Sequence, residues 1–290
     1  MKAPAFSYCR PENTGQVFDL IDLYGDDARL LAGGQSLMAA LNMRLDAPAV
    51  LIDLNGVGEL AGITHHNGRI RIGAMTRHAD VADSPLVAQH LPLLALAAPQ
   101  IAHPAIRNRG TFGGSIALAD PAAEWPACCV ALQADIVLAS RSGERRVSAG
   151  AFFRGLYETA RLSDEVLVAV EFAPARPDER AACQELAPRR GDYAWAGVAA
   201  QAAVEGLVLR DLRMAFFGVG ACPLAAPHAI AVLEGRAVTP ALIAEAQAAL
   251  EQDLEPSGDP QCSAQLRMRY AGVVLARALD DLLHVRSAGR

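Results

Sequence analysis

The sequence Ala32-Gly33-Gly34-Gln35-Ser36 joins a predicted strand, residues 28–31, to a predicted helix that runs from residue 36 to residue 45. A second segment of the same kind, Thr111-Phe112-Gly113-Gly114-Ser115, also precedes a helical stretch. Glycine has no Cβ, so consecutive backbone N–H groups can point into one concavity, and a helix N-terminus adds partial positive charge. Such backbone binds phosphate. The two segments therefore predict loops that hold the two phosphates of a dinucleotide from opposite sides.

Each glycine pair by itself is also compatible with an ordinary turn. Neither segment matches the phosphate-loop pattern G-x-x-x-x-G-K-[ST] or the Rossmann pattern G-x-G-x-x-G. From the residues alone, a phosphate-bearing cofactor and a purely structural role of both segments are open alternatives.

The first glycine segment lies in a predicted β-α-β-α-β unit that forms an N-terminal lobe over residues 1–55. Short strands are expected at residues 6–8, 28–31 and 50–54 from their apolar content. Asn13 or Thr14 can cap the first helix, whose apolar positions lie on one face before Gly25 ends it.

The second glycine segment lies in a predicted second lobe over residues 56–174. A hairpin is expected from strands 63–66 and 69–72, because Asn67-Gly68 favours a type I′ turn. Helical sequence follows from residue 76 to about residue 98, and residues 103–114 are predicted to form a loop. A second hairpin over residues 134–147 and a strand at 166–172 complete a predicted mixed sheet with covering helices.

A boundary is expected at residues 173–178, where two prolines and charged residues interrupt the apolar periodicity. Strands are predicted at 195–204 and 208–217, and helices at 240–251 and 264–283. Strands followed by helices indicate a small C-terminal α+β domain over residues 178–286, so the whole chain is predicted to be α+β.

The composition restricts the possible partners. The chain is 52% hydrophobic and 20% charged, as expected of a globular protein, and its formal net charge is −6. Scattered basic residues and a negative net charge argue against nucleic acid or an anionic membrane as the main partner. The sequence shows no secretory signal and no run of about 18 apolar residues, so we expect a cytoplasmic protein without a membrane span.

The cysteines and histidines indicate no metal site. Six cysteines are spread without a C-x-x-C pair, which favours a reducing compartment and argues against an iron–sulfur cluster on this chain. Cys128-Cys129 is interpreted as part of a buried helix rather than as a redox pair. No histidine pair has the H-x-x-x-H spacing, and no catalytic triad or carboxylate pair is identifiable.

Four segments in a fixed order resemble one known family. They are Ala32 to Leu37, Ile72 to Thr76, Arg107 to Ser115, and Arg189 to Ala194. The family is the FAD-binding medium subunit of carbon monoxide dehydrogenase and related xanthine dehydrogenase-type molybdenum hydroxylases, and the similarity runs essentially end to end.

The resemblance implies a two-lobed FAD-binding domain of the vanillyl-alcohol oxidase-like type, followed by the C-terminal α+β domain. It implies that this chain binds FAD noncovalently and that partner subunits carry the molybdenum cofactor and the [2Fe–2S] clusters. The implied partners are an iron–sulfur small subunit and a molybdenum-binding large subunit, assembled as a dimer of heterotrimers.

The resemblance also implies the cofactor-binding residues. The glycine segments would hold the FAD pyrophosphate, Glu124 would contact the ribityl side, Leu167 would lie against the flavin, and Tyr193 would approach the ring. The full predicted set is Ala32, Gly33, Gly34, Gln35, Ser36, Leu37, Gly73, Ala74, Thr111, Phe112, Gly113, Gly114, Ser115, Asp120, Glu124, Leu167, Asp192 and Tyr193.

Two residues depart from the family pattern. Ser115 stands where relatives commonly have Asn, and Glu185 stands where the xanthine dehydrogenase branch has a flavin-contacting lysine. Structural alternatives also exist for three predicted contacts. Asp120 and Glu124 can be helix-start residues that the helix dipole favours, and Tyr193 can be an ordinary strand aromatic.

The resulting hypothesis is an electron-transfer subunit that passes electrons from a partner's [2Fe–2S] clusters through FAD to an external acceptor. One alternative is a free-standing flavin-dependent oxidoreductase, which needs its own substrate pocket. Another is a non-enzymatic nucleotide-binding scaffold, in which the glycine segments are turns.

Overall fold

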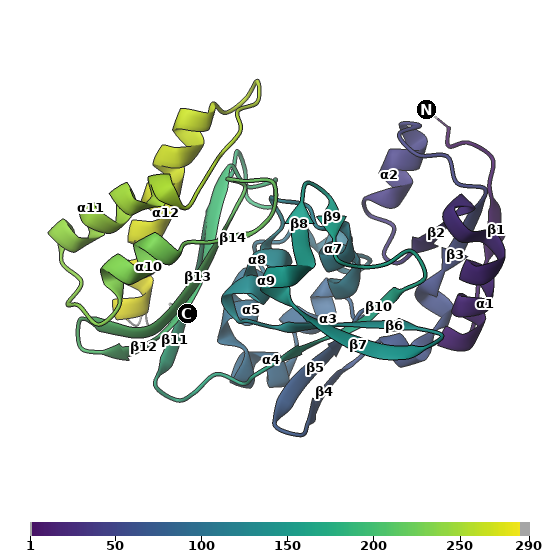
Figure 1. Cartoon of the computed structure of the whole chain (residues 1–290), viewed down its shortest axis with the longest axis horizontal. Helices are drawn as coiled ribbons and strands as arrows, with labels where there is room; N and C mark the ends of the chain where they lie inside the picture. Colours follow the sequence, from purple (N-terminus) through teal and green to yellow (C-terminus); the bar gives the residue numbers. More distant parts are fainter. Residues whose placement is uncertain (1, 285–290) are drawn as a thin grey trace.

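The first lobe of the computed structural model, which describes residues 2–284, is built on a parallel three-stranded sheet (Figure 1). Its strand order is β1-β3-β2, from β1 (Ser7–Cys9), β2 (Ala28–Leu31) and β3 (Val50–Asp53). The Asn13 side chain caps α1 (Thr14–Tyr24) by accepting from Gln16 N at 3.0 Å, and Gly25 ends the helix with φ +50°. The predicted strand and helix order is confirmed, but α2 (Leu37–Asn42) is shorter than expected.

The second lobe contains a five-stranded sheet of order β4-β5-β10-β6-β7. All neighbouring strands are antiparallel, so the expectation of a mixed sheet is wrong: each hairpin places its inner strand antiparallel to the central β10. Asn67 and Gly68 both have positive φ, which confirms the type I′ turn. The strands are β4 (Ile63–His66), β5 (Arg69–Gly73), β6 (Asp135–Ser140), β7 (Gly143–Ser148) and β10 (Val166–Phe172).

The predicted helical stretch from residue 76 to residue 98 is divided into three short helices. These are α3 (His78–Ala82), α4 (Pro85–His90) and α5 (Pro92–Ala97). Pro85 and Pro92 each begin a new helix, because proline suits the first turn and cannot continue the preceding one.

The region predicted as a loop over residues 103–114 contains the helix α6 (Pro104–Arg107) and the start of another. Gly113 and Gly114 lie inside the first turn of α7 (Phe112–Leu118), with Thr111 as its N-cap. The remaining elements of this lobe are α8 (Glu124–Ala131), α9 (Ala149–Phe152), β8 (Phe153–Gly155) and β9 (Glu158–Thr159).

The C-terminal part is an antiparallel sheet of order β11-β12-β13-β14 covered by helices (Figure 1). The sequence did not predict β11 (Glu179–Leu186), whose polar Arg180 and Gln184 side chains are bonded to the end of α12. It also missed α10 (Pro227–Leu233). The other elements are β12 (Ala196–Glu205), β13 (Val208–Phe217), β14 (Leu224–Ala225), α11 (Pro240–Ala249) and α12 (Ala264–Leu283), with single 3-10 turns at Gly25–Asp27, Leu54–Gly56, Gly58–Leu60 and Leu250–Gln252.

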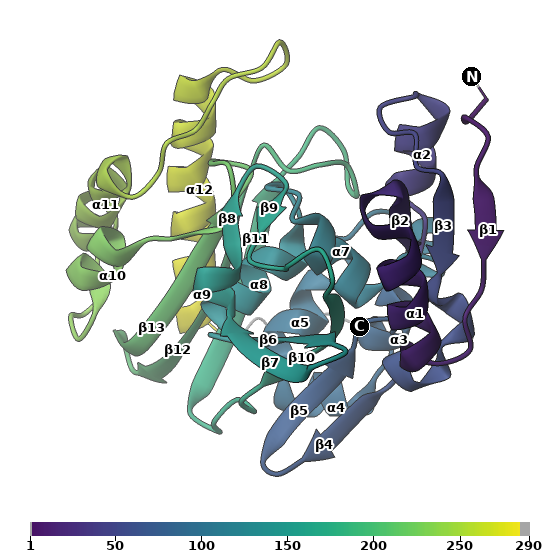
Figure 2. The same ribbon diagram turned by 45° about the vertical axis from the view of Figure 1, so that its right-hand side comes forward.

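The C-terminal sheet is covered on both faces. One face packs against α10 and α12, and the other packs against α5 and α8 of the second lobe. In Figure 2, α7 lies between the three-stranded sheet and α8. This arrangement brings the first lobe, α7 and α8 around one central region of the molecule.

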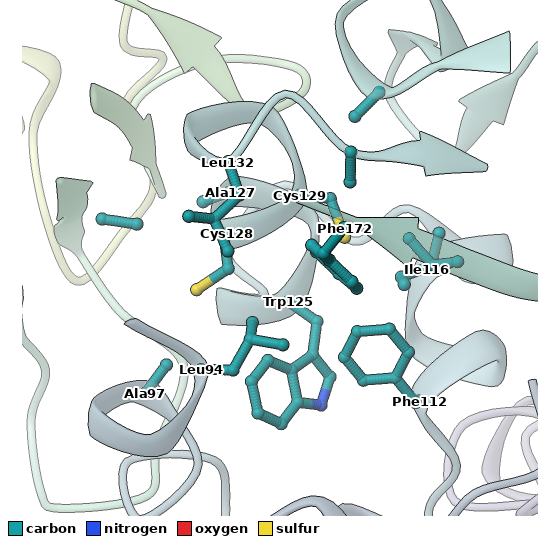
Figure 3. Close-up of a cluster of buried hydrophobic side chains, with 14 of the residues drawn as sticks. Leu94, Ala97, Phe112, Ile116, Trp125, Ala127, Cys128, Cys129, Leu132 and Phe172 are labelled. Atoms are coloured by element: carbon teal, nitrogen blue, oxygen red, sulfur yellow. The ribbon is translucent and has the colours of Figure 1, made fainter. Parts of the chain in front are cut away.

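An aromatic cluster fixes α7 and α8 to the second sheet (Figure 3). The rings of Phe112 and Trp125 are 5.1 Å apart between centroids, and Phe112 lies 6.1 Å from Phe172. Cys128 and Cys129 are also fully buried on α8, which confirms the interpretation that they belong to a buried helix.

The Trp125 indole also donates a hydrogen bond to Nδ1 of buried His78 at 2.9 Å. Nδ1 must therefore be unprotonated, and burial together with Arg77 and Arg107 lowers the pKa of His78 to about 4. The folded chain thus binds fewer protons than the unfolded chain between about pH 4 and the ordinary His pKa near 6.5, so it loses stability as the pH falls through this range.

We expect the wild type to lose about 1–2 kcal/mol more unfolding free energy than His78→Asn between pH 6.5 and pH 5. Urea unfolding at both pH values measures the difference. His66→Gln, at an exposed position on β4, is the control and should follow the wild type. Equal losses in the wild type and His78→Asn would show that His78 titrates normally.

Candidate functional site

A cavity of about 740 Å³ lies where the first lobe, α7 and the start of α8 meet. Its size is typical of a site for a large organic ligand. The structure brings most of the predicted residues together in its lining: Ala32, Gly33, Gly34, Gln35, Ser36, Leu37, Ala74, Thr111, Gly113, Gly114, Ser115, Asp120, Glu124, Leu167, Asp192 and Tyr193. Two predicted residues do not line it. Gly73 packs against the backbone of Leu60, and Phe112 points into the aromatic core.

The glycines allow the two predicted segments to touch. A Cβ at Gly33 would lie 2.7 Å from Gly110 Cα and would also collide with the carbonyl oxygen of Arg109. A Cβ at Gly113 would lie 2.6 Å from Ala74 Cα. Gly34 has φ +73°, a conformation that side chains with a Cβ disfavour. These glycines are therefore required by the packing of the protein backbone, whatever the cavity holds.

The two segments differ in the backbone donors that they offer. Within residues 2–284, the N–H groups of Gly33 through Leu37 donate to no protein acceptor, although the segment lines the cavity. In α7 the N–H groups of Phe112, Gly113 and Gly114 bond to Thr76 O, Ala74 O and Thr111 Oγ1 at 2.8, 2.8 and 3.2 Å. The expectation that both segments present free amides is therefore wrong for residues 112–115 of the second segment. The polar groups of this segment without a protein partner among residues 2–284 are the Thr111 N–H and the Ser115 hydroxyl, and both residues line the cavity.

Part of the cavity lining is acidic and phenolic. Asp120 accepts a hydrogen bond from Tyr157 Oη at 3.2 Å, and burial with Asp120 nearby raises the pKa of Tyr157 to about 12. Burial, with Glu185 and Asp120 close by, raises the pKa of Glu124 to about 8. Tyr193 is 69% exposed, and burial of its hydroxyl near these carboxyls raises its pKa.

Other lining residues were missed from the sequence. Arg29 and Arg161 line the cavity close enough for their charges to act on each other, and burial lowers the pKa of Arg161. Ile101, which was also missed, supplies apolar surface in addition to that of the predicted Leu167. Isolated arginines and an isoleucine carry no local sequence signal, because only the fold brings residues 29, 101 and 161 to one cavity.

The donors and surfaces of the cavity fit FAD. Consecutive unpaired amides of the first segment match the need of a pyrophosphate for N–H donors. Apolar side chains such as Ile101 and Leu167 can contact the flat ring systems. By contrast, the described part of the chain holds no group of three or more His, Cys, Asp or Glu side chains placed to bind a metal ion.

Comparison with known proteins identifies the family. Residues 4–174 match the model of the FAD binding domain in molybdopterin dehydrogenase, and residues 181–282 match that of the CO dehydrogenase flavoprotein C-terminal domain. The chain therefore belongs to the FAD-binding subunit family of the molybdopterin dehydrogenases. The family resemblance predicted from the sequence is confirmed.

Individual relatives cover nearly the whole chain. The nicotine 6-hydroxylase medium subunit of Paenarthrobacter nicotinovorans is 38% identical, over 97% of this chain and 98% of its own. The structure of carbon monoxide dehydrogenase from Hydrogenophaga pseudoflava superposes with TM-score 0.94 at 38% identity, covering 97% of this chain and 98% of that one. Quinoline 2-oxidoreductase from Pseudomonas putida 86 gives 0.93 at 37% identity, with 98% of both chains covered. The predicted combination of an FAD-binding domain and a C-terminal domain is confirmed.

None of the helices between residues 2 and 284 combines the length and apolar character that a membrane span requires.

We expect Gly33→Ala to destabilise the chain by roughly 2 kcal/mol, because the added methyl group collides with the backbone of Arg109 and Gly110. Urea unfolding measures the loss. Gly150→Ala is the matched control, since a Cβ there meets nothing within 4 Å and alanine favours the helix α9. If both variants unfold like the wild type, the two segments are not held in close contact in solution.

Proposed function

We propose that this chain is the electron-transfer subunit of a heteromeric molybdenum hydroxylase and holds FAD noncovalently in the 740 Å³ cavity. It passes electrons from [2Fe–2S] clusters on a partner to an external acceptor. The observation that carries the proposal is the run of unpaired amides, Gly33 to Leu37, in a cavity of a chain whose family binds FAD.

Each part of the cavity has a role in binding the cofactor. The amides of Gly33 to Leu37 and the Ser115 hydroxyl hold the pyrophosphate, and Leu167 supports a ring from β10. Glu124 and Tyr193 lie in the acidic and phenolic part of the lining, where they contact the flavin. The bound flavin supplies reversible two-electron chemistry, while the protein orients it and limits its contact with water.

The partners follow from the subunit names of the relatives. The nicotine hydroxylase relative is a medium subunit, and the carbon monoxide dehydrogenase structure was determined in a form lacking the Mo-pyranopterin moiety of its molybdenum cofactor. We assign this chain an iron–sulfur small subunit and a molybdenum-binding large subunit as partners, in a dimer of heterotrimers. A cytoplasmic location is supported by six free cysteines, Cys9, Cys128, Cys129, Cys183, Cys222 and Cys262.

The domain division is part of the same proposal. The two lobes, residues 1–55 and 56–174, would form an FAD domain of the vanillyl-alcohol oxidase-like type, followed by a domain over residues 178–286. Separate sheets support the division, and one hydrophobic cluster consists only of residues from the C-terminal domain. The proposed end at residue 286 lies outside the described residues.

We expect acid or heat denaturation to release FAD into the supernatant, because the cavity offers hydrogen bonds and apolar contacts. Absorbance and chromatography of the supernatant identify the flavin. Flavin that stays with the precipitate would contradict noncovalent binding, and FMN in place of FAD would contradict the pyrophosphate role of Gly33 to Leu37.

A second experiment separates the subunit hypothesis from a free-standing oxidoreductase. We expect organic substrates to leave the flavin of the isolated chain oxidised under anaerobic conditions, and to reduce it once the iron–sulfur and molybdenum subunits are added. The flavin absorbance reports both steps. Dithionite reduction of the isolated chain is the control that shows the flavin to be competent. Rapid bleaching by substrate alone would establish a free-standing enzyme.

A further inference from the structure

The loop between β11 and β12, residues 187–195, carries part of the cavity lining. Three of its residues line the cavity: Gly191, Asp192 and Tyr193. The base of the loop is closed by a hydrogen bond of 2.8 Å from Trp195 N to Leu186 O. The two strands thus fix the ends of the loop, whereas the position of its tip depends on what the tip packs against.

The tip packs against the backbone of Ala102 in the second lobe. Gly191 has φ +83°, and a Cβ added there would lie 2.7 Å from the carbonyl oxygen of Ala102 and 2.9 Å from its carbonyl carbon. A side chain does not fit into this space, and the positive φ also favours glycine. The tip of the loop is therefore in direct contact with one peptide group of the second lobe.

That peptide group is held by Arg107, the last residue of α6. Nη1 of Arg107 donates hydrogen bonds to the carbonyl oxygens of Ile101 and Ala102, both at 2.9 Å. Hydrogen bonds from a charged donor are stronger than those between neutral groups. The oxygen of Ala102 is thus both an acceptor for Arg107 and the atom against which Gly191 packs.

Ala102 needs such a restraint because its backbone lies in the left-handed region. Its φ is +45°, a conformation that a residue with a Cβ disfavours. Without a donor for its carbonyl oxygen, Ala102 would favour another backbone conformation and its peptide group would turn. The surface that contacts Gly191 would then be lost, and Tyr193, two residues further along the loop, would move.

We propose that Arg107 is a positioning residue that sets the place of Tyr193 in the cavity, acting through Ala102 and Gly191. Arg107 lies outside the cavity lining. Its role in holding the loop rests on this chain alone, whereas the contact between Tyr193 and the flavin rests on the proposed function. A substitution of Arg107 therefore changes the surroundings of the flavin without removing a group that touches it.

Limited digestion of the flavin-free chain with trypsin tests the attachment of the loop. Arg189 and Arg190 are exposed cleavage sites in the loop, and a mobile loop is cut faster than a held one. We expect Arg107→Met to be cut at these two sites about tenfold faster than the wild type, measured by mass spectrometry. Arg107→Lys should restore slow cleavage, since an ammonium group can donate to the same carbonyls. Arg236→Met, which also removes a bond to a backbone carbonyl, is the control and should match the wild type.

A second pair of variants tests the same contact from the side of the loop. Gly191→Ala should also speed cleavage, because the added methyl group collides with the carbonyl group of Ala102. Gly206→Ala is the matched control: its φ of +64° is equally unfavourable for alanine, but a Cβ there meets nothing within 4 Å. Unchanged cleavage in both Arg107→Met and Gly191→Ala would overturn the attachment, as would an acceleration spread evenly over all tryptic sites.

Flavin fluorescence tests the link between Arg107 and Tyr193. An aromatic ring in contact with a flavin quenches its fluorescence, so Tyr193→Leu should raise the emission of bound FAD several-fold. Arg107→Met should raise it too, and the double variant should show no increase beyond that of Tyr193→Leu, because Arg107 acts through Tyr193. Arg107→Lys should keep the emission quenched. Gel filtration before each measurement removes free flavin.

The outcomes separate this inference from the proposed function. An additive increase in the double variant, or full quenching in Arg107→Met, would overturn the positioning role of Arg107. A chain that binds no FAD but shows the expected trypsin pattern would overturn the proposed function, and it would leave the attachment of the loop by Arg107 intact.

Discussion

The close approach of Gly33 to the backbone of Arg109 and Gly110 is the contact on which the cavity depends. It brings the strand-to-helix turn of the first lobe against the residues that lead into α7. Hydrogen bonds reinforce it: Arg77 donates to Arg109 O and to Asn55, and Asn55 donates to Ala32 O at 2.9 Å. Without this contact the unpaired amides of the first lobe would not face the residues of α7 and α8.

The two glycine segments have similar sequences but different tasks. The amides of the first segment are free because these residues lie between the end of β2 and the first turn of α2. Neither a neighbouring strand nor a preceding helical turn supplies acceptors for them there. The second lies within a helix whose first amides bond to the loop before α3 and to the N-cap Thr111. Its glycines allow α7 to pack against Ala74, while buried Phe112 anchors it in the core. The first segment therefore offers consecutive amide donors to a ligand, whereas the second mainly fixes the position of α7 in the cavity wall and adds the Ser115 hydroxyl.

The C-terminal sheet contributes to the site without forming most of its lining. Its inner face packs on α5 and α8, so the start of α8 is held between two domains. The segment between β11 and β12 adds Gly191, Asp192 and Tyr193 to the cavity lining.

The sequence by itself determined the local elements whose signals are short-range: the Asn13 cap, the Asn67-Gly68 turn, α12, and the two glycine segments that indicated a dinucleotide. It also identified most of the residues that line the cavity, through the family resemblance. Only the tertiary structure decided which amides are free, because a backbone N–H is available only after all other acceptors have been placed. It likewise revealed β11, whose polar face is satisfied by α12, and it brought Arg29, Ile101 and Arg161 together. Residues that far apart in the chain are coupled through packing, which no local pattern encodes.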